Sequence, residues 1–297
     1  MKRVAIYVTL TAILFGTMEV ALKVGGSGLD SLQLTFLRFL IGAVMLIPFA
    51  VRERKMLGPV SAKDRRWVFL TGLVGISISM VLYQYGVERC NAATAAGLIC
   101  LNPLFTMVIA SIFTSETMTK RKYAAFALGL TAMILMIRPW DIQEGNTALG
   151  MALMVGAAIF FAIYTVMGKQ SIARVGTFTQ TCAGFFSGCA LILVVMIATG
   201  RPVLAGVPEN ILIVLYAGIF VTGLGYTFYF LAVKNSDAST GSIAFFIKPA
   251  IAPVLAVMIL GESLKATTVI GIALLITGSF LTLSGGAGKR QKDETAE

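Results

Sequence analysis

The chain matches itself at a fixed offset of 146 residues, and this internal repeat constrains its fold more than any other feature of the sequence. The match needs no gap, and it includes charged and helix-breaking residues within apolar stretches. Residues paired by this offset include Lys23 with Lys169, Pro103 with Pro249, Glu116 with Glu262, Phe15 with Phe161, Tyr83 with Tyr229 and Thr94 with Thr240. An apolar unit written twice in one chain is typical of membrane proteins built from internal repeats.

Composition independently indicates a membrane protein. Hydrophobic residues make up 57% of the chain and charged residues 13%, and the mean hydropathy is +0.87. Such a chain has too few polar groups to cover its surface, so we expect a lipid bilayer around it. Crossing about 30 Å of hydrocarbon takes roughly 17 to 25 mostly apolar residues. Ten such spans can be read, at residues 4–24, 31–51, 67–86, 94–115, 122–138, 148–168, 177–199, 210–233, 241–260 and 267–284.

The number of spans predicts how the two copies are arranged. Five spans per copy is an odd number, so the copies must enter the membrane with opposite polarity. We therefore expect an all-α membrane protein of ten transmembrane helices arranged as two inverted five-helix repeats, residues 1–146 and 147–284. Transporters built in this way bind substrate near the bilayer midplane and open to each side in turn. Residues 285–297 are polar and rich in glycine, and we expect a disordered cytoplasmic tail there.

Basic residues in the connections predict the orientation. Most of the 24 Lys and Arg residues fall in the connections on the side of the N-terminus, and basic connections are retained in the cytoplasm. Both termini are therefore expected to be cytoplasmic. The basic residues are scattered over short loops, so we expect no nucleic-acid partner. The expected partners are the lipid bilayer and a small-molecule substrate, and we expect a monomer.

The late part of each copy resembles a known module. The first copy has Pro103, Ser115-Glu116 and Gly129, and the second has Pro249, Gly261-Glu262-Ser263-Leu264, Gly271 and Gly278. This pattern resembles the duplicated module of the drug/metabolite transporter superfamily, and more narrowly its ten-helix EamA branch with amino-acid exporters of the YddG type. The resemblance extends from about Val4 to Ser284. It implies a multi-pass protein of a bacterial inner membrane that exports amino acids or other small metabolites.

Three charged residues lie within predicted spans and away from the span ends: Glu19, Arg38 and Lys248. A charge in the hydrocarbon costs about 2.5 to 3.5 kcal/mol on insertion scales, so such residues normally face protein or a water-filled interior. Glu19 and Arg38 fall at similar depths. They are expected either to form a buried ion pair, or to contribute a cavity wall and, at Glu19, a site for proton coupling.

Lys248 is the stronger candidate for substrate binding. Pro249 follows it directly and Pro253 comes four residues later, and each proline removes a backbone donor from the helix. Freed carbonyls beside an ammonium could hold the two charged ends of an amino acid. The alternative is a lysine that reaches cytoplasmic water or binds helix carbonyls. Asn102, before the helix-breaking Pro103, occupies the equivalent position in the first copy.

Polar aromatic residues and one amide could complete a binding pocket. These candidates are Tyr83, Gln84, Tyr164, Tyr226 and Tyr229. Small residues at helical spacing, such as Gly184 and Gly188, predict close helix packing.

The leading hypothesis is a secondary transporter of amino acids or similar metabolites that works by alternating access. The alternatives are a carrier of phosphorylated or nucleotide-linked sugars, and efflux of hydrophobic cations. An enzyme is not expected, because the chain has no histidine, no carboxylate cluster and four cysteines without paired metal spacing. We expect no catalytic residues, no metal and no cofactor.

Overall fold

The computed structural model describes residues 2–18, 20–21, 28–137, 145–248, 251–261 and 266–293, and all regular structure within these ranges is helical. The helices, with π and 3-10 segments marked η, are α1 (Lys2–Gly16), α3 (Ser31–Leu57), α4 (Ala62–Gly72), η1 (Leu73–Ser79), α5 (Met80–Glu88), α6 (Ala92–Ile99), α7 (Asn102–Phe113), α8 (Lys120–Ile137), α9 (Ala148–Val175), α10 (Thr177–Ala198), η2 (Pro208–Asn210), α11 (Ile211–Tyr216), η3 (Ala217–Leu224), α12 (Gly225–Lys234), α13 (Ala238–Ser242), α14 (Ala244–Ile247), α15 (Ala252–Leu260) and α16 (Ala266–Asp293).

Six helical stretches of the described chain are long and apolar enough to cross a membrane. They are Ser31–Leu57, Ala62–Glu88, Thr94–Phe113, Ala148–Val175, Thr177–Ala198 and Pro208–Lys234. Shorter apolar helices cover Arg3–Gly16, Ala238–Ile247 and Ala266–Gly278. These lengths and compositions support a helical protein that crosses the membrane several times.

Helices begin at positions related by the sequence offset. The starting residues 146 apart are Lys2 and Ala148, Ser31 and Thr177, Ala62 and Pro208, Ala92 and Ala238, and Lys120 and Ala266. The π-helical segments η1 and η3 lie at overlapping equivalent positions, within the third predicted span of each copy. Local sequence explains several of these starts, because side chains cap the first turn. Asn91 accepts a hydrogen bond from the backbone of Thr94, and its equivalent Asp237 accepts one from Thr240.

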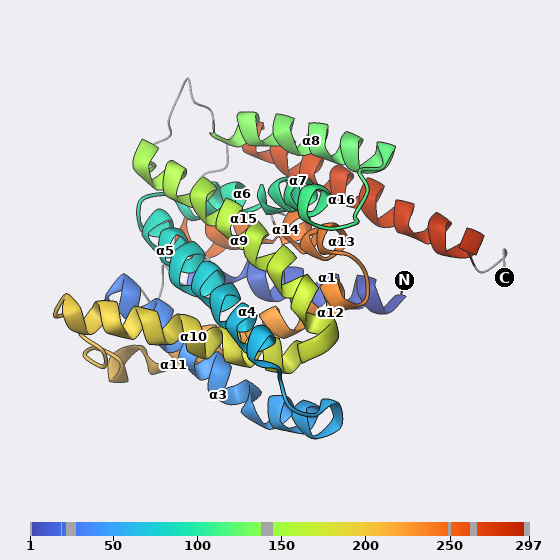
Figure 1. Ribbon diagram of the computed structural model, residues 1–297. Coiled ribbons are helices and arrows are strands. Elements are labelled where there is room, and N and C mark those ends of the chain that lie inside the picture. The colour runs from blue at the N-terminus through green and yellow to red at the C-terminus, as the bar shows by residue number, and fades with distance from the viewer. Residues whose placement is uncertain are drawn as a thin grey trace.

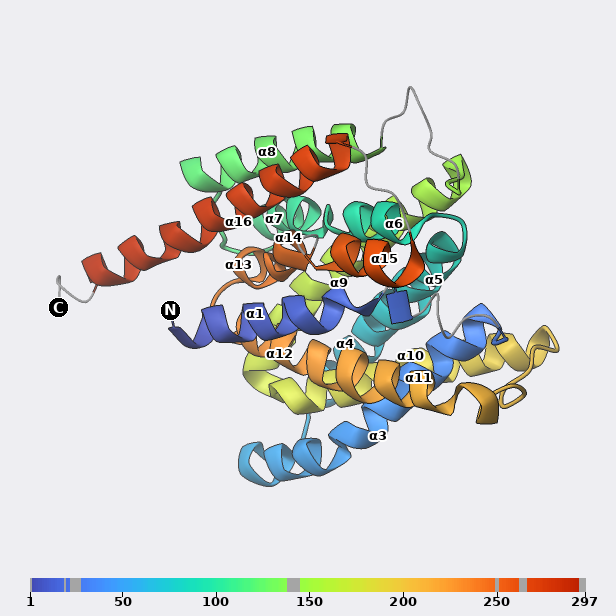
Figure 2. The same cartoon turned by 180° about the vertical axis from the view of Figure 1, so that it is seen from behind.

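The helices form a layered bundle (Figure 1). Helices α8 and α16 pack side by side along one edge, and α3 and α10 pack together at the opposite edge. Helices α1, α6, α7 and α9 and the short helices α13 to α15 lie between these layers (Figure 2). Helix α1 begins and helix α16 ends at the same end of the molecule.

Glycines allow two close helix crossings. A Cβ atom at Gly188 of α10 would lie 3.0 Å from the carbonyl oxygen of Gly72 at the end of α4, and one at Gly42 of α3 would lie 3.3 Å from that of Gly218 in η3. The predicted close packing of α10 therefore occurs against α4 and η1. Glycine lets two backbones approach in this way because it has no side chain to intervene.

Two features differ from the continuous spans read in the sequence. The fourth span is interrupted at residues 100–101 between α6 and α7, and the ninth is divided into α13, α14 and α15. Helix α16 continues to Asp293, where the sequence predicts a disordered tail from residue 285. Adding residues to an existing helix is far easier than starting one, and Lys289, Arg290 and Gln291 favour helix; the disorder of the tail stays a prediction.

Candidate functional site

A small enclosed cavity lies among the central helices. Its volume is about 10 Å³, close to the room that one water molecule needs. The lining residues are Phe15, Met18, Met80, Tyr83, Ile99, Phe161, Tyr226, Phe245 and Lys248. Side chains from both copies therefore line one buried cavity. Its described lining consists of aromatic rings, two methionine thioethers, the Ile99 side chain and the ammonium of Lys248.

Lys248 lies at the C-terminal end of α14 with only 1% of its surface exposed. Its Nζ atom is 5.7 Å from the centre of the Tyr83 ring and 5.9 Å from that of Phe245. An ammonium over aromatic faces is attracted by their electron-rich surfaces. The structure thus places this lysine within the protein and away from bulk water, as a group that lines the cavity.

Tyr226 is the aromatic centre of the cavity wall. Its ring packs at 5.1 Å from Phe15, 5.3 Å from Phe185 and 5.5 Å from Phe39. Its hydroxyl donates to Sδ of Met80 at 3.0 Å. These three ring pairs meet edge to face, the geometry that aromatic quadrupoles favour. Helices α1, α3 and α10 therefore hold the Tyr226 ring in place.

The other predicted polar residues do not line the cavity. The Tyr229 hydroxyl is 2.6 Å from Oγ1 of Thr165, which itself donates to the carbonyl of Phe161 at 2.9 Å. Tyr229 therefore donates its proton to Thr165 and joins two helices. Tyr164 packs on Phe161 and Phe230, and its hydroxyl has no hydrogen-bond partner within the described ranges.

Gln84 is buried on α5, and its Oε1 atom likewise lacks a partner among the residues that the structure describes. Asn102 at the start of α7 is fully buried and donates from Nδ2 to the carbonyl of Ala158 at 3.2 Å. Its Oδ1 accepts from Thr106 at 3.4 Å. The asparagine thereby ties α7 to α9, next to Pro103 in the first turn.

Arg38 is completely buried in α3 and also lies outside the cavity lining. One of its nitrogens, Nη1, donates to Oγ1 of Thr222 over a long 3.5 Å, and the guanidinium lies 4.4 Å from the centre of the Phe39 ring. In the described part of the chain, Nε and Nη2 have no hydrogen-bond partner.

Two residues to which the sequence analysis gave roles lie outside what the structure describes. Glu19 and Pro249 lie outside the described residues, so the Glu19–Arg38 ion pair stays a prediction. Pro253 lies in the first turn of α15.

Sequence reasoning assigned no binding role to most of the apolar lining residues. A usable signal was present, because Phe15 and Phe161, Met80 and Tyr226, and Ile99 and Phe245 are each 146 residues apart. Equivalent residues of two copies can line one cavity only if it lies where the copies meet. The same argument places Asn102 and Lys248, also an equivalent pair, at related positions of the two broken spans.

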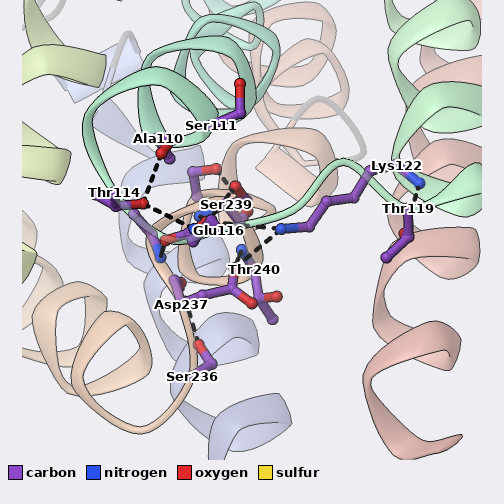
Figure 3. Close-up of polar contacts among 12 residues, drawn as sticks. Ala110, Ser111, Thr114, Glu116, Thr119, Lys122, Ser236, Asp237, Ser239 and Thr240 are labelled. Carbon is purple, nitrogen blue, oxygen red and sulfur yellow. Dashed lines mark hydrogen bonds and ion pairs between the residues drawn. The ribbon is translucent and has the colours of Figure 1, made fainter. Parts of the chain in front are cut away.

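A cluster of polar contacts joins the connection between α7 and α8 to the start of α13 (Figure 3). Glu116, in the connection between α7 and α8, accepts hydrogen bonds from the backbone nitrogens of Ala238 at 2.7 Å and Ser239 at 3.2 Å. Its carboxylate also accepts from the Ser239 hydroxyl at 2.6 Å. A carboxylate from the first copy thus caps α13 of the second copy, as charged caps do at a helix N-terminus.

Two lysines reinforce this cluster. The Nζ atom of Lys122 lies 3.6 Å from both Glu116 and Asp237, and its side chain is 10% exposed. Lys169 of α9 donates to the carbonyls of Val233 at 2.7 Å and Ser236 at 2.6 Å. Residues of α8, α9 and the α7–α8 connection therefore all bind the connection between α12 and α13 or the start of α13. We call these five groups the end clasp: Glu116, Lys122, Lys169, Asp237 and Ser239.

No group of metal-ligating residues occurs in the ranges that the structure covers, and their four cysteines are buried and unbridged. The central cavity contains one basic group, hydroxyls and apolar side chains. As it stands the cavity has room for about one water molecule, so a larger molecule could enter only after it widens.

Helices long and apolar enough to span a membrane, with a buried lysine and tyrosines among them, are typical of membrane transporters. The model of the EamA-like transporter family matches the chain twice, over residues 2–138 and 148–284, and the chain belongs to this family. The resemblance seen in the sequence is confirmed, and the protein is a transporter rather than an enzyme.

Several relatives match over almost their whole length. An uncharacterized transporter of Clostridium kluyveri is 35% identical over 96% of this chain and 94% of the relative. A probable terminal-alkyne amino-acid exporter of Streptantibioticus cattleyicolor is 24% identical, with 96% and 95% covered. A solved crystal structure has a TM-score of 0.75 at 18% identity, with 96% of this chain and 97% of the other covered, and this likeness supports the fold.

Proposed function

We propose that this chain is a secondary transporter that moves amino acids or similar small metabolites across the membrane by alternating access. The observation that carries the proposal is the closed central cavity, in which Lys248 stands among Tyr83, Tyr226 and Phe161. An ammonium provides a partner for a carboxylate, and the aromatic walls suit the remaining apolar part of a small metabolite. The name of the Streptantibioticus relative, an amino-acid exporter, is consistent with this substrate class.

The proposed architecture is a ten-helix bundle of two inverted repeats, residues 1–146 and 147–284. Contacts between equivalent positions support it. Gly42 approaches Gly218 while Gly188 approaches Gly72, so each residue of one contact has its equivalent in the other. The hydroxyl of Tyr226 also bonds its own equivalent, Met80. Reciprocal contacts and a contact between equivalents are the pattern that a two-fold axis generates.

Alternating access then follows from the near-equivalence of the halves. Each half can adopt the shape of the other, which opens the cavity to one side while closing it to the opposite side. In this proposal the end clasp is the contact that keeps one side shut while the cavity opens to the other. Because most basic connections share a side with the N-terminus, we propose that the clasp faces the cytoplasm, that both termini lie there, and that the membrane is a bacterial inner membrane.

Roles are proposed for the remaining sequence candidates. Lys248 holds the substrate carboxylate, and Tyr83 and Tyr226 form the walls. Asn102, Gln84, Tyr164 and Tyr229 shape the surrounding helices. Proton coupling, if the cycle uses it, is assigned to Glu19, because it is the acidic residue placed well inside a predicted span.

Uptake into liposomes tests the proposed function. The purified chain is reconstituted, and entry of a panel of labelled amino acids is measured beside a sugar phosphate and a lipophilic cation. We expect saturable amino-acid uptake that falls at least about tenfold in Lys248→Ala, the loss that follows from removing one charged contact.

The matched control is Lys234→Ala, because Lys234 is an exposed lysine at the end of α12. Its uptake is expected to equal that of the unaltered chain. Flux of only the sugar phosphate or the cation would overturn the substrate class, and full activity of Lys248→Ala would remove its role as anchor.

A further inference from the structure

The buried guanidinium of Arg38 is the polar group that the described structure leaves least satisfied. It has none of its surface exposed, and two of its nitrogens lack partners among the described residues. Its Nη1 atom donates to Thr222 over a long 3.5 Å, and its side chain also interacts with the Tyr226 hydroxyl. Burying a charge with few hydrogen bonds is costly, and among the described residues Nε and Nη2 of Arg38 have no partner to offset that cost.

Comparison of the two copies shows that the fold itself does not require this charge. The position equivalent to Arg38 is Gly184, and the position equivalent to its partner Thr222 is Ile76. Lys248 follows the same rule, since its equivalent is the neutral Asn102. Each of these two cations therefore has a neutral residue at the equivalent position of the other copy.

The two cations flank the same pair of tyrosines. Tyr83 and Tyr226 both line the central cavity with Lys248, and both are also among the groups nearest to Arg38. The guanidinium packs on Phe39, whose ring lies 5.5 Å from that of Tyr226. Arg38 therefore lies next to two of the tyrosines that line the cavity, although it does not line the cavity itself.

We propose that Arg38 forms a second anion-binding point of the central site, and that the transported metabolite carries two carboxylates, as an acidic amino acid does. This inference rests on the proposed function and narrows its substrate class. A guanidinium presents paired N–H donors that match the two oxygens of a carboxylate. The unused Nε and Nη2 lie on one edge of the guanidinium, which is the edge such a two-point contact requires.

Glutamate and glutamine provide matched ligands, because they share a shape and differ in one carboxylate. Thermal unfolding of the purified full chain and uptake into liposomes are measured with each ligand, for the unaltered chain and for Arg38→Met. We expect the unaltered chain to prefer glutamate by at least about tenfold, and Arg38→Met to lose this preference while still binding glutamine.

The stability of Arg38→Met without ligand separates a ligand role from a structural one. Removing an unpartnered buried charge should leave the unfolding temperature unchanged or raise it. Arg38→Lys keeps the charge, loses the paired donors, and is expected to keep part of the preference for glutamate.

Three results would overturn the inference: equal binding of the two ligands by the unaltered chain, a glutamate preference that survives in Arg38→Met, or unfolding of both variants. Glutamine binding and uptake by the unaltered chain report on the proposed function separately. Their presence without a preference for glutamate would leave that function standing and remove only the second anion-binding point.

Discussion

At Gly72 the backbones of two helices meet without any intervening side chain. A Cβ atom there would overlap both the carbonyl oxygen of Gly184 and the hydroxyl oxygen of Ser187. Backbone atoms cannot move aside as a flexible side chain can, so Gly72→Ala should destabilise the fold by about 1 to 3 kcal/mol through overpacking. Thermal unfolding in detergent checks this.

Gly156→Ala is the control for that measurement, because its new methyl would meet only Cδ1 of Leu82 at 3.5 Å, an ordinary contact. Alanine favours helix over glycine, so this variant should be as stable as the unaltered chain or slightly more stable. Equal losses in the two variants would contradict the close crossing of α4 and α10.

For single residues, the sequence predicts whether a side chain is buried better than it predicts which neighbour that side chain faces. Lys248 and Arg38 could be recognised as interior groups, because a charge within an apolar span must avoid lipid. Tyr83 and Tyr226 were likewise identified as pocket candidates, and both line the cavity. Tyr229 is turned toward Thr165 instead, because the rotation of a helix about its axis depends on packing that no single span contains.

At the scale of elements, the connection between α7 and α8 holds α13 through Glu116. Glu116→Ala removes three hydrogen bonds to Ala238 and Ser239, and bonds to a charged group contribute about 1.5 to 3 kcal/mol. We therefore expect α13 to open at least about tenfold more often. Ser242→Cys, at a position with none of its surface exposed, should then react faster with a membrane-impermeant maleimide.

Glu209→Ala serves as the control in the same Ser242→Cys background. Glu209 is exposed in η2, which precedes α11, whereas α13 follows α12 at the far end of this helical stretch. Its labelling rate should match that of Ser242→Cys alone. A rate unaffected by Glu116→Ala would show that the end clasp does not hold this end shut.

Element positions were largely predictable, and their internal irregularities were not. Apolar length and side-chain caps such as Asn91 and Asp237 mark where helices start. The break between α6 and α7 lies beside Pro103, which removes a backbone donor. The π-helical segments η1 and η3 have no comparable sequence signal, because an extra residue per turn is imposed by contacts such as that of Gly75 with the Tyr164 ring.

At the scale of the molecule, two related halves enclose one site. The offset of 146 residues could be read from the sequence, but the reciprocal glycine contacts and the shared cavity needed three-dimensional structure. The structure shows the cavity closed, with room for about one water molecule, so a bound metabolite requires the halves to separate first.

Counterflow in liposomes tests this account most directly. Vesicles containing the reconstituted chain are loaded with unlabelled amino acid and diluted into a trace of the labelled compound. An alternating-access carrier returns with labelled substrate each time it exports an unlabelled molecule, so the account predicts a transient accumulation of label above the outside concentration. Label that only rises to the outside concentration, at a rate that the internal load leaves unchanged, would contradict it.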